Sequence, residues 1–147
     1  MTELTEPELK LRKTLIYKQG CFANLSSEEI DVLATLMYEV KFIAGDTIVK
    51  QGDRVDCIYI IVEGSADVLS SHIENHKSIT EKVAELHENN AIGLSEYGFY
   101  SLTGQRTATV IATSDMVTLK LSIALFRGFA LAHPHVNRVM REQAERL

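Results

Sequence analysis

The fold is decided by residues 40–68, VKFIAGDTIVKQGDRVDCIYIIVEGSADV. Short runs of β-branched and aromatic residues alternate here with Gly45, Gly52 and Gly64. β-branched and aromatic residues favour strands, and glycine adopts corner conformations that a β-carbon disfavours. The stretch therefore predicts strands joined by tight turns, as in a small antiparallel roll whose strands each turn one face to the core.

Helical patterns flank this region on both sides. Apolar residues recur at helical spacing from Glu8 to about Tyr17 and again in SSEEIDVLATLM, where Ser26 or Ser27 is a candidate N-cap. After the strands, SIALFRGFALA and PHVNRVMREQAERL return to helical spacing, and Pro134 suits a first helical turn. The sequence predicts one α+β domain, mainly β, with helices over residues 1–38, a roll over 39–122 and helices over 123–147.

The composition excludes several classes of protein. The chain has 147 residues, 46% of them hydrophobic, which is typical of one globular domain with its own core. A net charge of -5 argues against sequence-independent nucleic-acid binding, although a small anion could bind in a local positive pocket. The apolar runs are too short to span a bilayer, and the N-terminus lacks a signal-peptide pattern. We expect a cytoplasmic protein without membrane insertion, in which Cys21 and Cys57 are reduced and buried.

The motifs of residues 40–68 resemble the first half of a cyclic nucleotide-binding domain. They are Phe-x-x-Gly from Phe42, Gln-Gly-Asp from Gln51, Asp-x-x-Tyr-x-Ile from Asp56 and Gly-x-x-x-Val from Gly64. Each motif is weak alone, whereas the ordered set is specific. The resemblance extends from about Phe22 through the last helix, and it implies an eight-stranded antiparallel roll (jelly-roll-like) with leading helices and two closing helices.

The resemblance also covers the family's phosphate-binding cassette, within residues 93–110. The sequence RTATV, from Arg106, matches the end of the cassette. Counting back ten residues from Arg106 places Glu96 on the family's glutamate, with Ser95 where the family has glycine. A second register places Gly93 on the family's glycine and leaves Leu94 at the glutamate position. We prefer the first register because it retains both charged groups.

The resemblance implies separate roles for these residues around a cyclic nucleotide. A helix beginning near Ser95 would present backbone N–H groups to the phosphate, and Arg106 would add charge-assisted hydrogen bonds. Glu96 would accept a hydrogen bond from the ribose 2′-hydroxyl. Thr107 would reach the phosphate or the base without deciding between cAMP and cGMP. The predicted ligand-binding residues, including two apolar walls from the preceding strand, are Val83, Leu86, Ser95, Glu96, Tyr97, Gly98, Arg106, Thr107 and Ala108.

Without the family pattern, the same residues have simpler interpretations. Arg106 would be a surface arginine at the start of a strand, and Glu96 an acid that complements a helix dipole. The histidines could suggest a metal, but His133 and His135 straddle a helix start and no acid–histidine cluster falls on the strands. We interpret the histidines as solvated, and we predict no metal site, cofactor or catalytic residue.

Two functional hypotheses follow for the chain. The first is a regulatory module that binds cAMP, with cGMP as the alternative ligand, and relays binding through movement of its C-terminal helices to an effector domain or partner outside this chain. The second is a degenerate roll that has lost the nucleotide and serves as an interaction or oligomerisation domain, for instance a homodimer formed through the last helix. An enzyme of the cupin type is a remote third, because the metal ligands are missing.

Overall fold

The computed structural model describes residues 4–95, 98–99 and 104–145. The helices are α1 (Glu6–Tyr17), the 3-10 turn η1 (Gly20–Phe22), α2 (Ser27–Leu36), α3 (Ile123–Ala132) and α4 (Pro134–Glu145). The strands are β1 (Tyr38–Phe42), β2 (Thr47–Val49), β3 (Cys57–Glu63), β4 (Ala66–Glu74), β5 (Lys77–Leu86), β6 (Ala91–Ile92), β7 (Leu94–Ser95), β8 (Gly98–Phe99), β9 (Thr109–Ala112) and β10 (Met116–Ser122).

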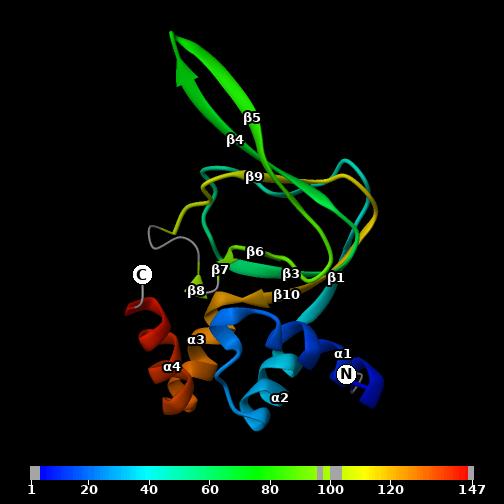
Figure 1. The fold of residues 1–147 in the computed structure, drawn as a ribbon, viewed down its shortest axis with the longest axis vertical. Helices are drawn as coiled ribbons and strands as arrows, with labels where there is room; N and C mark the ends of the chain where they lie inside the picture. Colours follow the sequence, from blue (N-terminus) through cyan, green and yellow to red (C-terminus); the bar gives the residue numbers. More distant parts are fainter. Residues whose placement is uncertain (1–3, 96–97, 100–103, 146–147) are drawn as a thin grey trace.

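The strands form two antiparallel four-stranded sheets and one short ribbon. The first sheet has the order β1-β10-β3-β6, the second has the order β2-β9-β4-β5, and β7 pairs with β8. Figure 1 shows the helices grouped on one side of the first sheet and the second sheet on the other side, with β4 and β5 projecting beyond the roll. The two sheets confirm the predicted eight-stranded antiparallel roll with flanking helices. No helix among the described residues is both long and apolar enough to cross a membrane.

Strand β3 is buried on both faces, which explains its unbroken apolar sequence. Ile58 and Ile60 pack with the helices in one core cluster. Cys57, Tyr59 and Ile61 alternate with them and belong to a second cluster inside the roll. Successive side chains of a strand point to opposite faces, so one strand contributes to both cores. The helical layer and the interior of the roll are therefore joined through β3.

The helix ends follow the predicted capping signals. Ser26 is the N-cap of α2, and its side chain accepts a hydrogen bond from the backbone of Glu29 while Glu29 accepts one from the backbone of Ser26. This reciprocal capping box satisfies two N–H groups that a helix start would otherwise leave unpaired. Helix α4 begins at Pro134, where the missing N–H of proline costs nothing. Its residues Val136 and Val139 are buried in the helical core, as their spacing predicts.

Glu29 also connects the first and last parts of the chain. Its carboxylate oxygens lie 2.7 and 3.0 Å from Nδ1 of His135, in the first turn of α4. The side chain of His135 is 40% exposed, so it is partly solvated as predicted, and tertiary packing also places it beside Glu29, which is only 8% exposed. Burial alone would raise the pKa of Glu29, but the hydrogen bonds from Ser26 and His135 outweigh it and lower the pKa below 4.5.

We expect Glu29→Gln to lower the free energy of unfolding at neutral pH by about 1.5–3 kcal/mol, the range for hydrogen bonds to charged groups. Glutamine can retain the capping box, so the loss reports on the charged contact with His135. The folded-state pKa of Glu29 lies below the unfolded value, so its stabilisation is present above pH 4.5 and is lost as the pH falls through the folded-state pKa. Denaturant unfolding measured on both sides of this interval should show a smaller pH dependence in the variant.

The matched control is Glu28→Gln, because Glu28 is exposed in the first turn of the same helix. An equal loss of stability in both variants would contradict a specific role for the Glu29–His135 contact.

Candidate functional site

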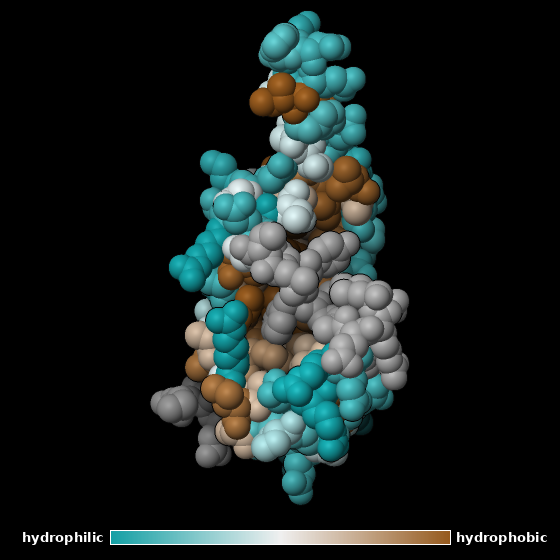
Figure 2. All heavy atoms as spheres, turned by 90° about the vertical axis from the view of Figure 1, so that its left-hand side faces the viewer, coloured by the Kyte–Doolittle hydropathy of each residue, from teal (hydrophilic) through white to brown (hydrophobic). Residues whose placement is uncertain are grey.

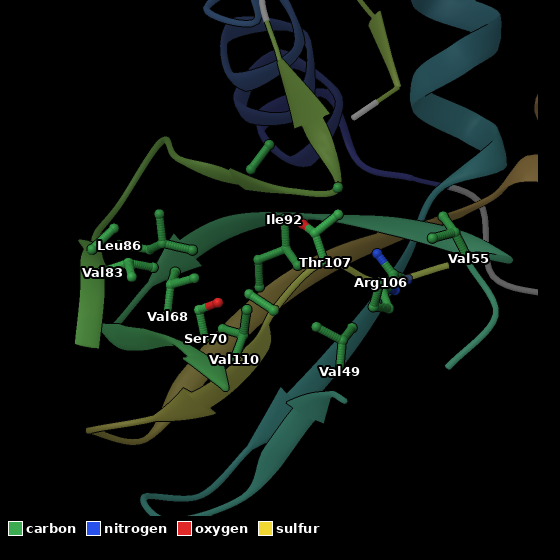
Figure 3. A pocket seen from close by; sticks show the side chains of 14 residues that line it. Val49, Val55, Val68, Ser70, Val83, Leu86, Ile92, Arg106, Thr107 and Val110 are labelled. Carbon is green, nitrogen blue, oxygen red and sulfur yellow. The ribbon is translucent and has the colours of Figure 1, made fainter. Parts of the chain in front are cut away.

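A cavity of about 530 Å³ lies between the second sheet and strand β6. Its volume is within the usual range for a small-molecule site. Strands β2, β4, β5, β6 and β9 and the segment that precedes β9 contribute side chains to it (Figure 3). The described lining residues are Val49, Val55, Val68, Ser70, Val83, Ala84, Leu86, Ala91, Ile92, Gly93, Arg106, Thr107, Ala108 and Val110.

The cavity has a charged end and an apolar end. Arg106 is the only charged side chain among the described lining residues. Figure 3 shows Arg106 towards one end, Leu86 and Val83 towards the other, and Thr107 between them. Apart from Arg106, the described polar side chains are those of Ser70 and Thr107. Such a cavity suits a ligand that has one small anionic group and a flat or apolar body.

Arg106 is fixed by both its backbone and its side chain. Its N–H donates to the carbonyl of Asp53 at 2.7 Å, and its carbonyl accepts from the N–H of Gly52 at 2.9 Å. Its Nη2 donates to the carbonyl of Cys57 at 2.7 Å. The residue is 8% exposed, and its Nη1 has no hydrogen-bond partner among the described residues. A buried, unpaired guanidinium nitrogen is costly, so the arrangement favours an anion beside Nη1.

The thiol nearest to Arg106 does not supply that negative charge. Sγ of Cys57 lies 3.5 Å from Nη2 of Arg106. Burial raises the pKa of the Cys57 thiol, which keeps it protonated and neutral. The positive charge at this end of the cavity therefore stays available to a bound anion.

Gly93 allows the arginine to occupy its position. A β-carbon on Gly93 would lie 2.8 Å from Nη1 of Arg106 and 3.2 Å from Cγ2 of Ile58. Its φ of +88° also falls in the region that favours glycine. Gly93 lines the cavity, whereas Ser95, the alternative position for the family's glycine, lies in strand β7. The preferred register does not place Gly93 on the family's glycine, because the close approach of Gly93 to Arg106 depends on packing that sequence spacing does not reveal.

The structure brings together five of the predicted site residues. Arg106, Thr107, Ala108, Val83 and Leu86 all line the cavity. Of the others, Ser95 lies in β7 and Gly98 in β8. Glu96 and Tyr97 lie outside the described residues.

The helix predicted to begin near Ser95 is wrong. Leu94 and Ser95 pair with Phe99 and Gly98 as an antiparallel ribbon. Segments this short have little intrinsic preference, and pairing with another strand decides their conformation. Ser95 therefore does not begin a helix whose backbone N–H groups could bind the phosphate.

A β-bulge explains how Val83 reaches the cavity. Val68 pairs with Ala84 and Leu69 pairs with Lys82, so Val83 has no opposite residue on β4. Bulges re-aim the side chain of the extra residue. Val83 is 56% exposed and still lines the cavity, which places it at the mouth. Figure 2 shows apolar surface where the projecting hairpin joins the body.

Sequence reasoning missed Val68 and Ser70 as cavity residues. They lie two positions apart on β4 and both line the cavity. Their spacing in the sequence DVLS could have predicted that they share one face, because residues two apart point to the same side of a strand.

Comparison with known proteins gives a consistent result. The family model described as "Cyclic nucleotide-binding domain" matches residues 39–133. A cAMP-dependent protein kinase regulatory subunit of Dictyostelium discoideum is 31% identical over 122 residues, which are 83% of this chain and 36% of that protein. The chain thus spans about a third of the length of this curated relative.

Solved structures share the fold at lower identity. The N-terminal domain of a transcriptional regulator from Streptomyces coelicolor A3(2) has a TM-score of 0.74 and 23% identity, covering 90% of this chain and 88% of that chain. The regulatory subunit of a cAMP-independent protein kinase A from Trypanosoma brucei has a TM-score of 0.68 and 23% identity, covering 95% and 48%. At these identities the likeness shows the fold alone.

Proposed function

Because the chain belongs to the cyclic nucleotide-binding domain family, we propose that its cavity binds a 3′,5′-cyclic nucleotide, cAMP or cGMP. The chain then acts as a regulatory module without a catalytic step of its own. The observation that supports this proposal best is Arg106, a buried guanidinium at one end of an apolar cavity, whose Nη1 has no hydrogen-bond partner among the described residues. One phosphodiester carries one negative charge, which matches one arginine.

The described residues suggest how the parts of the nucleotide lie. The cyclic phosphate contacts Nη1 of Arg106, with Thr107 and Ala108 beside it. The base occupies the apolar end, against Leu86 and the bulged Val83. Glu96, Ser95, Tyr97 and Gly98 remain predicted ligand residues on the basis of the family pattern, with Glu96 accepting from the ribose 2′-hydroxyl.

The relay to the C-terminal helices has a short physical route. Nη2 of Arg106 donates to the carbonyl of Cys57, and the next residue, Ile58, packs in the helical core with Phe126 and Val136. A ligand shifts the helices only as far as it binds one arrangement better than another. We propose that a change at Arg106 biases the packing of α3 and α4 through β3.

Isothermal titration calorimetry of this chain with cAMP and with cGMP tests the proposal. We expect at least one of them to bind with a dissociation constant near or below about 1 μM, equivalent to about -8 kcal/mol. Two controls define the contacts. The 2′-deoxy analogue should bind more weakly because it lacks the donor to Glu96, and 5′-AMP should bind more weakly because its phosphate monoester carries more than one charge at neutral pH.

Absence of binding heat with either nucleotide at millimolar concentration would overturn the proposal and would favour the interaction-domain hypothesis. The effector, a homodimer through α4 and the cytoplasmic location stay predictions, since the chain spans only part of the relatives that it matches.

A further inference from the structure

Among the described strands, only β9 pairs with the β4–β5 hairpin that forms one wall of the cavity, and it does so at the base of the hairpin. Strand β9 pairs with β4 from Ala66 to Leu69. Strand β4 continues to Glu74, and its described strand partner there is β5. Figure 1 shows this hairpin projecting beyond the second sheet. A two-stranded hairpin is marginally stable alone, so the position of the wall depends on what fixes the hairpin just beyond its pairing with β9.

Gln51 supplies one more rung at that point. Its Nε2 donates to the carbonyl of Ser71 at 2.9 Å, and its Oε1 accepts from the N–H of Ser71 at 2.8 Å. Ser71 is two residues beyond Leu69, where the next pair of ladder hydrogen bonds would fall. The N–H of Gln51 also donates to Oγ1 of Thr109, the first residue of β9, at 2.9 Å. The side-chain amide thus replaces the missing residue of β9.

The turn that contains Gln51 also fixes the arginine of the cavity. Its next two residues, Gly52 and Asp53, make the two backbone hydrogen bonds to Arg106. On the other side, Ser71 is adjacent to Ser70, which lines the apolar end. Residues 51–53 therefore connect both ends of the cavity, one through the backbone and the other through a single amide side chain.

We propose that Gln51 is a positioning residue, which sets the hairpin wall of the cavity relative to Arg106 without touching the ligand. The inference rests on the proposed function, because a fixed position of the wall relative to Arg106 matters only if a ligand contacts both. Only a primary amide offers one donor and one acceptor in the geometry of a peptide group. Position 51 therefore requires a side chain that both donates and accepts a hydrogen bond, and not only one of the right size.

Hydrogen exchange of the Ser71 amide in ligand-free protein tests the structural part. In Gln51→Ala this amide should exchange about tenfold faster than in the natural chain, since its acceptor is removed. In Gln51→Glu a carboxylate oxygen can still accept from this N–H, so protection should be largely kept while the Ser71 carbonyl loses its donor. Unchanged exchange in Gln51→Ala would overturn the inference. Thermal unfolding of each variant shows that it is folded.

Nucleotide binding tests the positioning part. We expect Gln51→Ala to weaken binding of the nucleotide that the natural chain binds by about tenfold. Arg12→Ala is the matched control, because it also removes two hydrogen bonds between a side chain and the backbone, here those to the carbonyls of Ala34 and Met37. Its affinity should be unchanged.

The double variant of Gln51→Ala and Arg106→Ala separates positioning from a general loss of stability. If Gln51 acts by placing the wall relative to Arg106, the two losses of affinity are not independent, and the double variant loses less than the product of the single losses. Multiplicative losses would contradict the inference. If the natural chain binds neither nucleotide, the proposed function fails, while the Ser71 exchange still decides whether Gln51 fixes the wall.

Discussion

Arg106→Ala weakens binding of the cyclic nucleotide by at least about tenfold, the expected cost of one charge-assisted hydrogen bond of about 1.5–3 kcal/mol. The guanidinium is the single charged group among the described lining residues, none of which pairs with its Nη1. Calorimetric titration gives the affinity directly. The shift in unfolding temperature with added nucleotide gives an independent measure, because a ligand that binds only the folded state stabilises it.

Arg106→Lys is the matched variant for this prediction. Lysine keeps the charge but lacks the planar fork that can donate to the Cys57 carbonyl and to a phosphate at the same time. We expect its affinity to fall between those of the natural chain and Arg106→Ala. The ligand-free alanine variant should remain folded, because the substitution also removes an unpaired buried nitrogen. Natural affinity in Arg106→Ala would show that the phosphate does not lie beside this residue.

The largest expected loss of stability is that of Gly64→Ala. Gly64 joins β3 to β4 with a φ of +100°, and a β-carbon there would lie 2.5 Å from the carbonyl oxygen of Asp115 and 2.8 Å from Cγ of Met116. The first neighbour is backbone and cannot move aside cheaply. Backbone strain of about 1–3 kcal/mol and overpacking of about 1–3 kcal/mol both oppose folding. Urea denaturation should show a loss of about 3 kcal/mol or more.

Gly45→Ala is the control that separates strain from overpacking. Gly45 has a φ of +95°, and nothing lies within 4 Å of the position of its β-carbon. Its substitution introduces strain alone, of about 1–2 kcal/mol. If Gly64→Ala costs no more than Gly45→Ala, the close approach of the Asp115 carbonyl does not limit this turn.

Much of the fold was predictable because it depends on local patterns. The alternation of β-branched residues, the capping serine of α2 and Pro134 of α4 each act within a few residues of their own position. Arg106 could also be placed, because the sequence RTATV combines strand alternation with a recognised family motif. These signals depend on the spacing of residues along the chain, which can be read directly from the sequence.

The features that sequence could not predict depend on contacts between distant segments. Glu29 meets His135 although 106 positions separate them, and Gln51 meets Ser71 across 20 positions. Neither pair leaves a periodic signal in the chain. The sequence does not predict the ribbon of β7 and β8, because segments this short have little intrinsic preference and tertiary pairing decides their conformation.

The exposed tip of the β4–β5 hairpin is a site where additional sequence can be inserted. Asn75 and His76, with φ values of 51° and 64°, form a two-residue turn of the type that tolerates positive φ, and both residues are exposed. The Gln51–Ser71 rung lies between this tip and the cavity. Exposed turns of this kind accept inserted sequence with little effect on folding. A fluorescent reporter placed between Asn75 and His76 would therefore sit outside both cores while remaining attached to a wall of the cavity, which makes this turn the natural insertion point for a genetically encoded sensor.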